Sequence, residues 1–435
     1  MVAIPSSDVS GPFDPLGLSV NKLVRRVAIA VGALLFVSSL LFISFSPTVA
    51  VQKRPSAQDL QAARKVWQQL KLTQGEAATQ VRVDNRMMAG LSALTRDATG
   101  VERINAVLSN GELRAHASVT LPLGLWLNAS ASATGNPSGF PPLQLTIGRL
   151  VLPAAAGRLL ANLVRLSLRK RGAKIPPLDK VVQSFSIDGG YVVANVRLPS
   201  KTGLVDGAIA ASSSGTSREL VEGIFCRIAA AQRAEPVNTL SALIRRTFTE
   251  GPGENPEDYN NASFVALSLA VVGDRAEALI PRAAELRKKC SFPEGALLLQ
   301  GRADLAKHWV LSAALTSVFG PQAAGNLGEW KELDDSLGDG SGFSFVDLAA
   351  DRAGVKTALL ALNRQTAHTT KKKLSRATDD YMLPKLLLEA PEGLSNASFV
   401  QRFGRLEQKN YVEAVSRIDR ILAQHLSREI ASSRP

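Results

Sequence analysis

The sequence predicts an α+β protein with a single N-terminal transmembrane helix, an antiparallel β-rich domain with an embedded helix, and an all-α domain. Three observations support this. A continuous apolar run lies near the N-terminus, apolar and polar residues then alternate with a period of two, and the rest of the chain has helical periodicity. The expected divisions are a cytoplasmic tail at 1–26, the transmembrane helix at 27–46, the β-rich membrane-proximal domain at 52–200, a linker at 201–217 and the all-α domain at 218–431.

The apolar run at residues 27–45 contains 19 apolar or small residues and follows Arg25 and Arg26. That is about the length of chain that spans a bilayer core. Positive charges before the run predict a cytoplasmic N-terminus. We therefore expect a single-pass inner-membrane protein with its bulk in the periplasm. A cleaved signal peptide is the alternative, because Thr48 to Ala50 resembles a cleavage site, although the run exceeds a usual signal core.

The composition is that of a globular protein with a basic surface. The chain has 435 residues, enough for two or three domains, and a formal net charge of +13. A basic protein favours anionic surfaces, and the sequence lacks the interleaved aromatic and basic residues typical of nucleic-acid binding. The expected partners are the inner membrane, lipid and envelope proteins, and not nucleic acid.

Only two cysteines occur, Cys226 and Cys290. An oxidising compartment favours a disulfide between them, and two buried thiols are the alternative.

Helical spacing predicts a helix at residues 56–72, and alternation then predicts strands between residues 78 and 199. Within this region the sequence Asp188-Gly189-Gly190 separates two strand-like segments and is typical of a hairpin. One helix is expected there, at about 155–170. It ends in a basic cluster that either contacts anionic lipid or forms a solvated helix end. The cluster consists of Arg165, Arg169, Lys170, Arg171 and Lys174.

The order of these elements includes a strand ending in IGRLVLP, an apolar helix and a VQSFSIDGG hairpin. This order resembles bacterial envelope domains of the YpmS and tubular lipid-binding type. The resemblance implies a curved antiparallel sheet that, together with its helix, can hold an acyl chain. The alternative is a sheet whose concave face is filled by its own helix.

The all-α region begins after the linker. Candidate helices lie at 218–232, 238–248, 262–270, 275–286, 294–300, 304–315 and 326–337, with further helices from about 344 and 395, and a breaker at 251–261.

An acidic stretch stands out within this region. Seven carboxylates lie between Glu329 and Asp351, against the single base Lys331. Just upstream, His308 and Ser312 lie four residues apart and so share one helical face.

Spacing within the acidic stretch predicts where its side chains point. Glu332 and Asp335 lie three residues apart on one helical face, and Ser344 with Asp347 predicts a capping box at the start of the next helix. If the three helices pack side by side, four of these side chains converge. They are His308, Glu332, Asp335 and Asp351, with Asp347 as a further candidate for a polar site.

The run KELDDS, followed by GSGFSFVDLAADRAG and preceded by DLAKHWVLSAAL, resembles a pattern in small predicted bacterial lipoproteins and, more loosely, in VanZ-like envelope proteins. The span from about residue 217 to the C-terminus also resembles uncharacterised bacterial envelope proteins. The resemblance implies a shared domain without a defined activity. The present segments are more polar than those of VanZ-like proteins, so we do not expect them to cross a bilayer.

Three interpretations of this polar group remain open, and one of them is a functional polar site without catalysis. A divalent cation (zinc, manganese or magnesium) held by His308, Glu332, Asp335 and Asp351 is the cofactor hypothesis, and metal-bound water could then attack an ester. Alternatively the group is structural. Asp347 would then cap its helix, Glu332 would pair with Lys331 or Arg302, and Asp351 would pair with Arg352 or Lys307.

The sequence contains no nucleophile elbow, HExxH, CxxC or P-loop motif. It therefore favours a non-enzymatic factor of envelope biogenesis or assembly, with a lipid- or protein-binding β-domain and a helical interaction domain. One alternative is a metal-dependent hydrolase of an envelope lipid or polymer. The other is a scaffold subunit of a larger inner-membrane complex.

Overall fold

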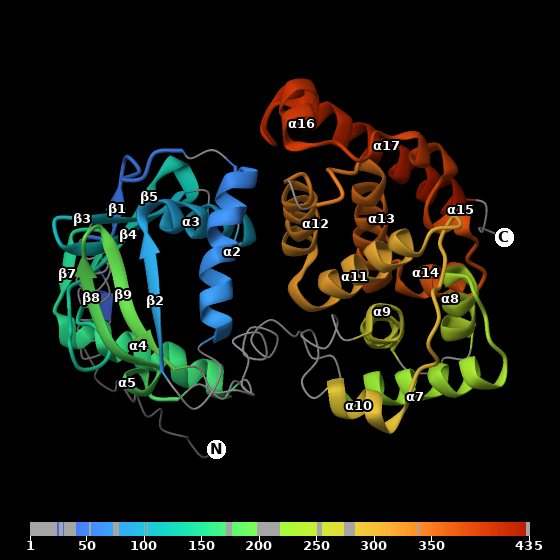
Figure 1. Ribbon diagram of the computed structural model, residues 1–435, viewed down its shortest axis with the longest axis horizontal. Coiled ribbons are helices and arrows are strands. Elements are labelled where there is room, and N and C mark those ends of the chain that lie inside the picture. The colour runs from blue at the N-terminus through green and yellow to red at the C-terminus, as the bar shows by residue number, and fades with distance from the viewer. Residues whose placement is uncertain are drawn as a thin grey trace, which may run out of the picture.

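The computed structural model describes residues 24–25, 29, 41–51, 54–72, 78–99, 101, 103–170, 176–197, 218–249, 255–273, 283–337 and 340–431. Within these residues the protein is α+β, with antiparallel sheets in the N-terminal half and helices in the C-terminal half, as predicted (Figure 1).

Several predicted features lie wholly or mostly outside the described residues. They are most of the transmembrane segment at 27–46, the linker at 201–217, and Arg171 and Lys174 of the basic cluster. The predicted end of the transmembrane helix at residue 46 is wrong, because Ile43–Ser44 is a strand that pairs with Trp126 and Leu127, and the apolar run alone does not show where the helix stops. Across the part of the chain that is described, no helix combines the length and the apolar character needed to cross a membrane.

The strands form two antiparallel sheets. A six-stranded sheet has the order β3-β4-β5-β6-β7, with β1 added on β5, and a three-stranded sheet has the order β2-β9-β8. The strand bounds are β1 Ile43–Ser44, β2 Thr79–Asp84, β3 Arg103–Ser109, β4 Glu112–Thr120, β5 Trp126–Ala133, β6 Leu143–Ile147, β7 Leu150–Leu152, β8 Val182–Asp188 and β9 Tyr191–Val196. The expectation of one curved sheet is therefore wrong, because alternation reveals strands but not their pairing.

Register in the large sheet puts apolar side chains on one face. Ile104 pairs with Ala117, Ala117 with Ala129, and Ala129 with Ile147. The next row runs through Ala106, Ala115, Ala131 and Leu145 in the same way. The period-two alternation thus gives the large sheet one apolar face. In the small sheet the predicted hairpin is confirmed, with Gly189 and Gly190 between β8 and β9.

The helices of the N-terminal half are α2 Ala57–Leu72, α3 Asn85–Thr99, α4 Ala154–Lys170 and α5 Leu178–Val181, together with the short turn η1 Pro122–Gly124. The prediction of one embedded helix within the β-rich region is wrong, because α3 lies there as well as α4. Met87, Met88 and Leu91 of α3 pack into the small core of this half. Helix α3 is short and begins directly after β2. The alternating pattern of the strands on both sides therefore made its helical spacing hard to recognise in the sequence.

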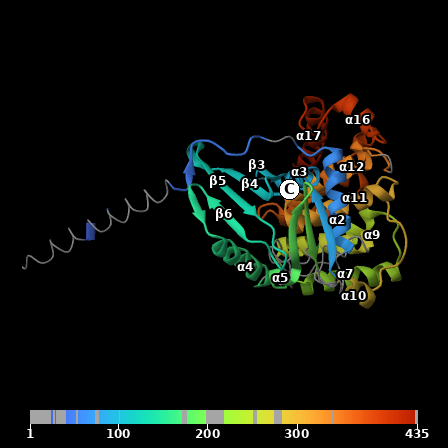
Figure 2. The ribbon, with the colours of Figure 1, turned by 60° about the vertical axis from the view of Figure 1, so that its left-hand side comes forward.

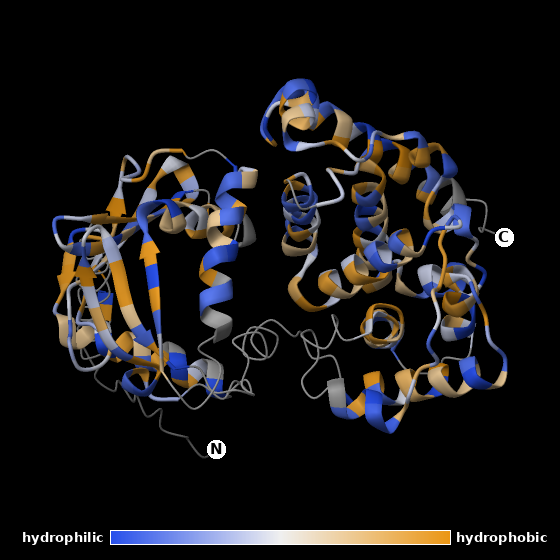
Figure 3. Ribbon diagram, viewed as in Figure 1, coloured by the Kyte–Doolittle hydropathy of each residue, from blue (hydrophilic) through white to orange (hydrophobic). Residues whose placement is uncertain are grey.

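The described residues of the C-terminal half form helices and loops. Its elements are α7 Arg218–Ala234, α8 Leu240–Thr249, α9 Pro256–Val272, α10 Ala283–Lys289, α11 Ala303–Phe319, α12 Pro321–Asp335, α13 Phe345–Leu362, α14 Ala367–Leu374, α15 Asp379–Met382, η3 Lys385–Glu389, α16 Asn396–Phe403 and α17 Lys409–Ala431. The core runs through α9, α11 and α13, and α9 is mostly apolar (Figure 3).

Two helical expectations are wrong. Residues 294–300 are not helical, because the buried side chains there, Leu297 and Leu299, alternate and the chain forms a bridge to Thr239 instead. The breaker at 251–261 also ends early. Asn255 accepts a hydrogen bond from the backbone N–H of Glu257 and caps α9, which begins at Pro256.

Helix α2 joins the two halves and lies between them in Figure 1. Leu60 belongs to the core of the helical half, whereas Val66, further along the same helix, belongs to the core of the β half. Arg64 on α2 also forms an ion pair with Asp334 of α12 at 2.9 Å. The helix that follows the predicted membrane segment is therefore packed by both halves.

Cys226 of α7 and Cys290, which follows α10, form a disulfide with a Cα–Cα distance of 5.1 Å. The predicted disulfide is confirmed, and the alternative of two free thiols is wrong. A structural disulfide is compatible with a domain outside the cytoplasm.

Replacing both cysteines with serine should destabilise the helical half by roughly 4 kcal/mol, because the bond closes a long loop in the unfolded chain. Unfolding by denaturant, followed by circular dichroism, measures the loss. A reductant should lower the stability of the unmodified protein and leave the double variant unchanged. Equal sensitivity of both proteins to the reductant would contradict the expectation.

Candidate functional site

Close packing of α11 against α13 creates the setting of the polar group. A Cβ atom placed on Gly354 of α13 would lie 2.2 Å from the backbone oxygen of Trp309 on α11. Glycine at this position therefore allows the two helices to touch through their backbones. Side chains one turn away on the facing surfaces are forced into contact, and these include His308, Ser312 and Asp351.

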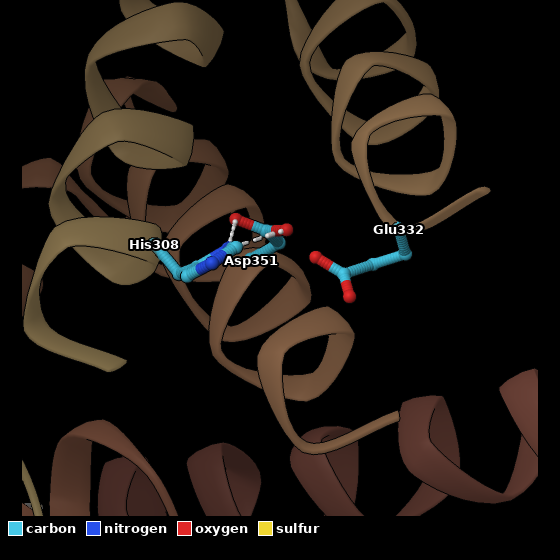
Figure 4. Close-up of side chains that lie close together, drawn as sticks. All are labelled: His308, Glu332 and Asp351. Atoms are coloured by element: carbon cyan, nitrogen blue, oxygen red, sulfur yellow. Dashed lines mark hydrogen bonds and ion pairs between the residues drawn. The ribbon is translucent and has the colours of Figure 1, made fainter. Parts of the chain in front are cut away.

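Asp351 is the centre of the polar group and is 3% exposed. Its two carboxylate oxygens each lie 3.1 Å from Nδ1 of His308 (Figure 4). The Ser312 hydroxyl donates a hydrogen bond to the same carboxylate at 2.6 Å. His308 and Ser312, which were predicted to share a helical face, thus both contact the carboxylate of Asp351. The predicted alternative partners of Asp351, Arg352 and Lys307, are wrong.

Glu332 reaches the group from α12 and has no exposed surface. Its Oε2 accepts a hydrogen bond from the backbone N–H of Ser344 at 3.0 Å, and its Oε1 lies 3.1 Å from Nζ of Lys331. The expected pairing of Glu332 with Lys331 is therefore present. Glu332 also ties the end of α12 to the start of α13.

The capping box predicted at Ser344 is half formed. The Ser344 hydroxyl accepts a hydrogen bond from the backbone N–H of Asp347 at 3.0 Å, as an N-cap does. The reciprocal bond to the backbone N–H of Ser344 comes from Glu332 and not from Asp347. Asp347 instead lies 3.5 Å from Nε2 of His308 and 3.5 Å from the Arg302 guanidinium.

Burial and neighbouring charges shift the pKa values of the side chains in this polar group. Burial disfavours the charge on His308, but the Asp351 carboxylate outweighs it and raises the pKa of His308 to about 9. Burial raises the pKa of Glu332 to about 7, and it also raises the pKa of Asp347. The imidazolium of His308 and the ammonium of Lys331 thus share several buried carboxylates.

The structure brings together three of the predicted residues, His308, Glu332 and Asp351, which offer ligand atoms within 4.8 Å of one another. Asp335 is not one of them. Its carboxylate binds Nζ of Lys331 at 2.6 Å, one helical turn away, and its side chain is partly exposed. Two residues three apart on a short helix end need not point to the same side, and Lys331 holds Asp335 at the rim.

A second charged network was not predicted. Arg352 binds Asp419 of α17 and lies 3.6 Å from Glu329, and Glu329 also binds Arg54 at 2.5 Å. Because these partners are separated by up to 275 positions, no sequence spacing points to them.

The apolar surface of the β half is a second candidate site. On the apolar face of the large sheet, Ile104, Ala117, Ala129 and Ile147 are only half-buried. Helix α4 contacts the sheet through Gly157. A Cβ atom at this position would lie 2.0 Å from the backbone oxygen of Leu143, so only glycine allows this close approach. The leucines of α4 are instead between 43% and 61% exposed, and these are Leu159, Leu160, Leu163 and Leu166. If α4 filled the concave face of the sheet, these four leucines would be buried, and they are not.

The basic cluster on α4 is described in part. Arg165 donates a hydrogen bond to the Asn162 side chain at 3.3 Å, and Arg169 is exposed. Of Lys170 only the helical backbone is described.

Comparison of the chain with protein-family models, with curated proteins and with solved structures finds no match.

The close approach at Gly354 can be tested by substitution. Gly354→Ala should lower the free energy of unfolding by about 1–3 kcal/mol, because the added methyl overpacks the α11–α13 contact. Gly325→Ala on α12 is the matched control. Its Cβ would meet nothing within 4 Å, so it should stabilise the helix by up to about 1 kcal/mol. Denaturant unfolding measures both, and a stabilising Gly354→Ala would contradict the expected contact.

Proposed function

We propose that the protein is a single-pass bacterial inner-membrane protein whose periplasmic β half binds lipid and whose helical half is an interaction domain in envelope biogenesis or assembly. The observation that supports this most directly is the apolar surface of the β half. A half-buried sheet face and an exposed row of leucines on α4 lie within the same small domain. Exposed apolar side chains gathered in one domain are typical of a site for an apolar partner.

Lipid fits this surface better than a polar ligand does. The strands satisfy one another's backbone hydrogen bonds, and the apolar face offers alanine, leucine and isoleucine side chains. An acyl chain needs no hydrogen bonds and gains by leaving water. Helix α4 also carries Arg158, Arg165 and Arg169, and an amphipathic helix with basic residues suits an anionic lipid surface.

Photocrosslinking in intact membranes tests the lipid proposal. A photoreactive amino acid at Leu163, which is 52% exposed on α4, should capture phospholipid, detected by mass spectrometry of the adduct. The matched control is Leu386 in the helical half, which is 53% exposed and should give no lipid adduct.

Two other crosslinking results would contradict the proposal that the β half binds lipid. Protein adducts at Leu163 without lipid would favour the scaffold alternative, in which the apolar face meets a subunit. Equal lipid capture at both positions would show that exposure alone, and not the β half, determines the contact.

A divalent cation held by the helical half is a second candidate, favoured by the convergence of His308, Glu332 and Asp351. One imidazole with carboxylate oxygens suits zinc or manganese. Such a cation would tie α11, α12 and α13 together. All three ligand residues are at most 8% exposed, so a substrate has little direct access to them and a structural role fits better than hydrolysis.

Metal analysis of the full chain, purified in detergent without a histidine tag, tests this candidate. We expect about one equivalent of zinc or manganese after dialysis, and binding at least about tenfold weaker in Glu332→Gln. Asp335→Asn is the control and should bind like the unmodified chain, since Asp335 lies outside the group of three. The cysteines are paired and offer no competing thiolate. The unmodified protein failing to retain either metal would remove the candidate.

A further inference from the structure

Three hairpin turns of the β half each contain two consecutive residues with positive φ. Two of them are two-residue turns, in which this arrangement is that of type I′. Asn110 and Gly111 occupy the turn between β3 and β4, and Gly189 and Gly190 the turn between β8 and β9. Asparagine and glycine are the residues that tolerate this conformation best.

The turn between β4 and β5 is longer and has a leucine at a left-handed position. It spans Pro122 to Gly124, because Leu121 donates its backbone N–H to the backbone oxygen of Leu125 at 2.7 Å. Its two left-handed residues are Leu123, with φ 65° and ψ 20°, and Gly124, with φ 73°. A left-handed conformation is costly for leucine because its Cβ crowds the backbone. Leu123 is also 95% exposed, so no packing contact within the described structure compensates for the strain. A strained and exposed leucine at a turn tip points to a partner outside the fold.

The end of the sheet that carries this turn is also where the chain arrives from the predicted membrane segment. Ser44 of β1 pairs with Trp126, the first residue of β5, and Arg149 donates its backbone N–H to the backbone oxygen of Leu41 at 2.7 Å. Figure 2 shows β1 at the end of the large sheet that lies away from the helical half. The turn tip and β1 therefore lie at the same end of one sheet.

Exposed apolar side chains gather at this end. They are Leu41, Phe45, Val119, Leu123, Leu150 and Val151, and Phe45 is 87% exposed. Trp126 lies beside them, with the Arg103 guanidinium 4.6 Å from the centre of its ring. Tryptophan and arginine flanking an apolar surface are typical of a membrane interface.

We propose that the Pro122–Gly124 turn inserts Leu123 into the outer leaflet of the inner membrane, beside the N-terminal anchor. This inference rests on the proposed function, because it requires the β half to lie outside the cytoplasm next to the bilayer. Insertion holds the large sheet with one end at the membrane surface. The apolar sheet face then begins at the bilayer surface, which gives an acyl chain a path out of the bilayer.

Depth measurement in vesicles tests the insertion. The native cysteines are paired, so a cysteine introduced by Leu123→Cys can be labelled alone with an environment-sensitive fluorophore. The control is Asn110→Cys, which also has positive φ and lies in the turn at the opposite end of β4. The full chain is reconstituted into vesicles of phosphatidylethanolamine and phosphatidylglycerol that carry nitroxides on their acyl chains.

The expected result is quenching severalfold stronger at position 123 than at position 110, with a blue-shifted emission at 123 only. Equal quenching at the two turns, whether strong or weak, would overturn the inference. The lipid crosslink at Leu163 separates this failure from failure of the proposed function. Capture of lipid at Leu163 without quenching at 123 would leave a lipid-binding β half and remove the inserted turn.

Discussion

The backbone contact between α11 and α13 is the constraint on which the helical half depends. Because Gly354 lets α13 approach Trp309 closely, Asp351 lies within hydrogen-bonding distance of His308 and Ser312. A buried carboxylate requires a positive charge and hydrogen-bond donors nearby. Both donors are supplied by the facing helix, so the contact that buries the charge also neutralises it.

The need to satisfy buried polar groups also determines how the end of α12 contacts the start of α13. Glu332 accepts the backbone N–H of Ser344, which leaves the Ser344 hydroxyl to cap α13. The start of α13, the end of α12 and the buried charges are thus one unit, and displacement of any one leaves a buried polar group unsatisfied. The buried polar network described in the β half contains neutral groups only, with Ser118 donating to Asn128 at 2.6 Å. The core of this half is small and its sheet face is half-buried, so it retains apolar surface that can serve a ligand.

Local patterns of the sequence predicted the local parts of this structure. The cap at Ser344, the Gly189–Gly190 turn and the shared face of His308 and Ser312 each depend on residues within a few positions, and all three are present. The pairing of Arg352 with Asp419 depends on tertiary packing, and sequence spacing carries no information about it. The same holds for Asp335, whose direction is set by Lys331 at the end of α12.

The turn at Leu123 shows how a departure from local rules can be weighed energetically. Holding leucine in the left-handed region costs roughly 1–2 kcal/mol. Transfer of a fully exposed leucine side chain from water into an apolar environment returns roughly 1.5–3 kcal/mol. In water the leucine keeps the cost of the left-handed conformation without the gain from burial. Selection for stability alone would therefore favour asparagine, the residue at the left-handed position 110 in the turn between β3 and β4. In contact with a bilayer the balance reverses, and leucine becomes the residue that stabilises the turn.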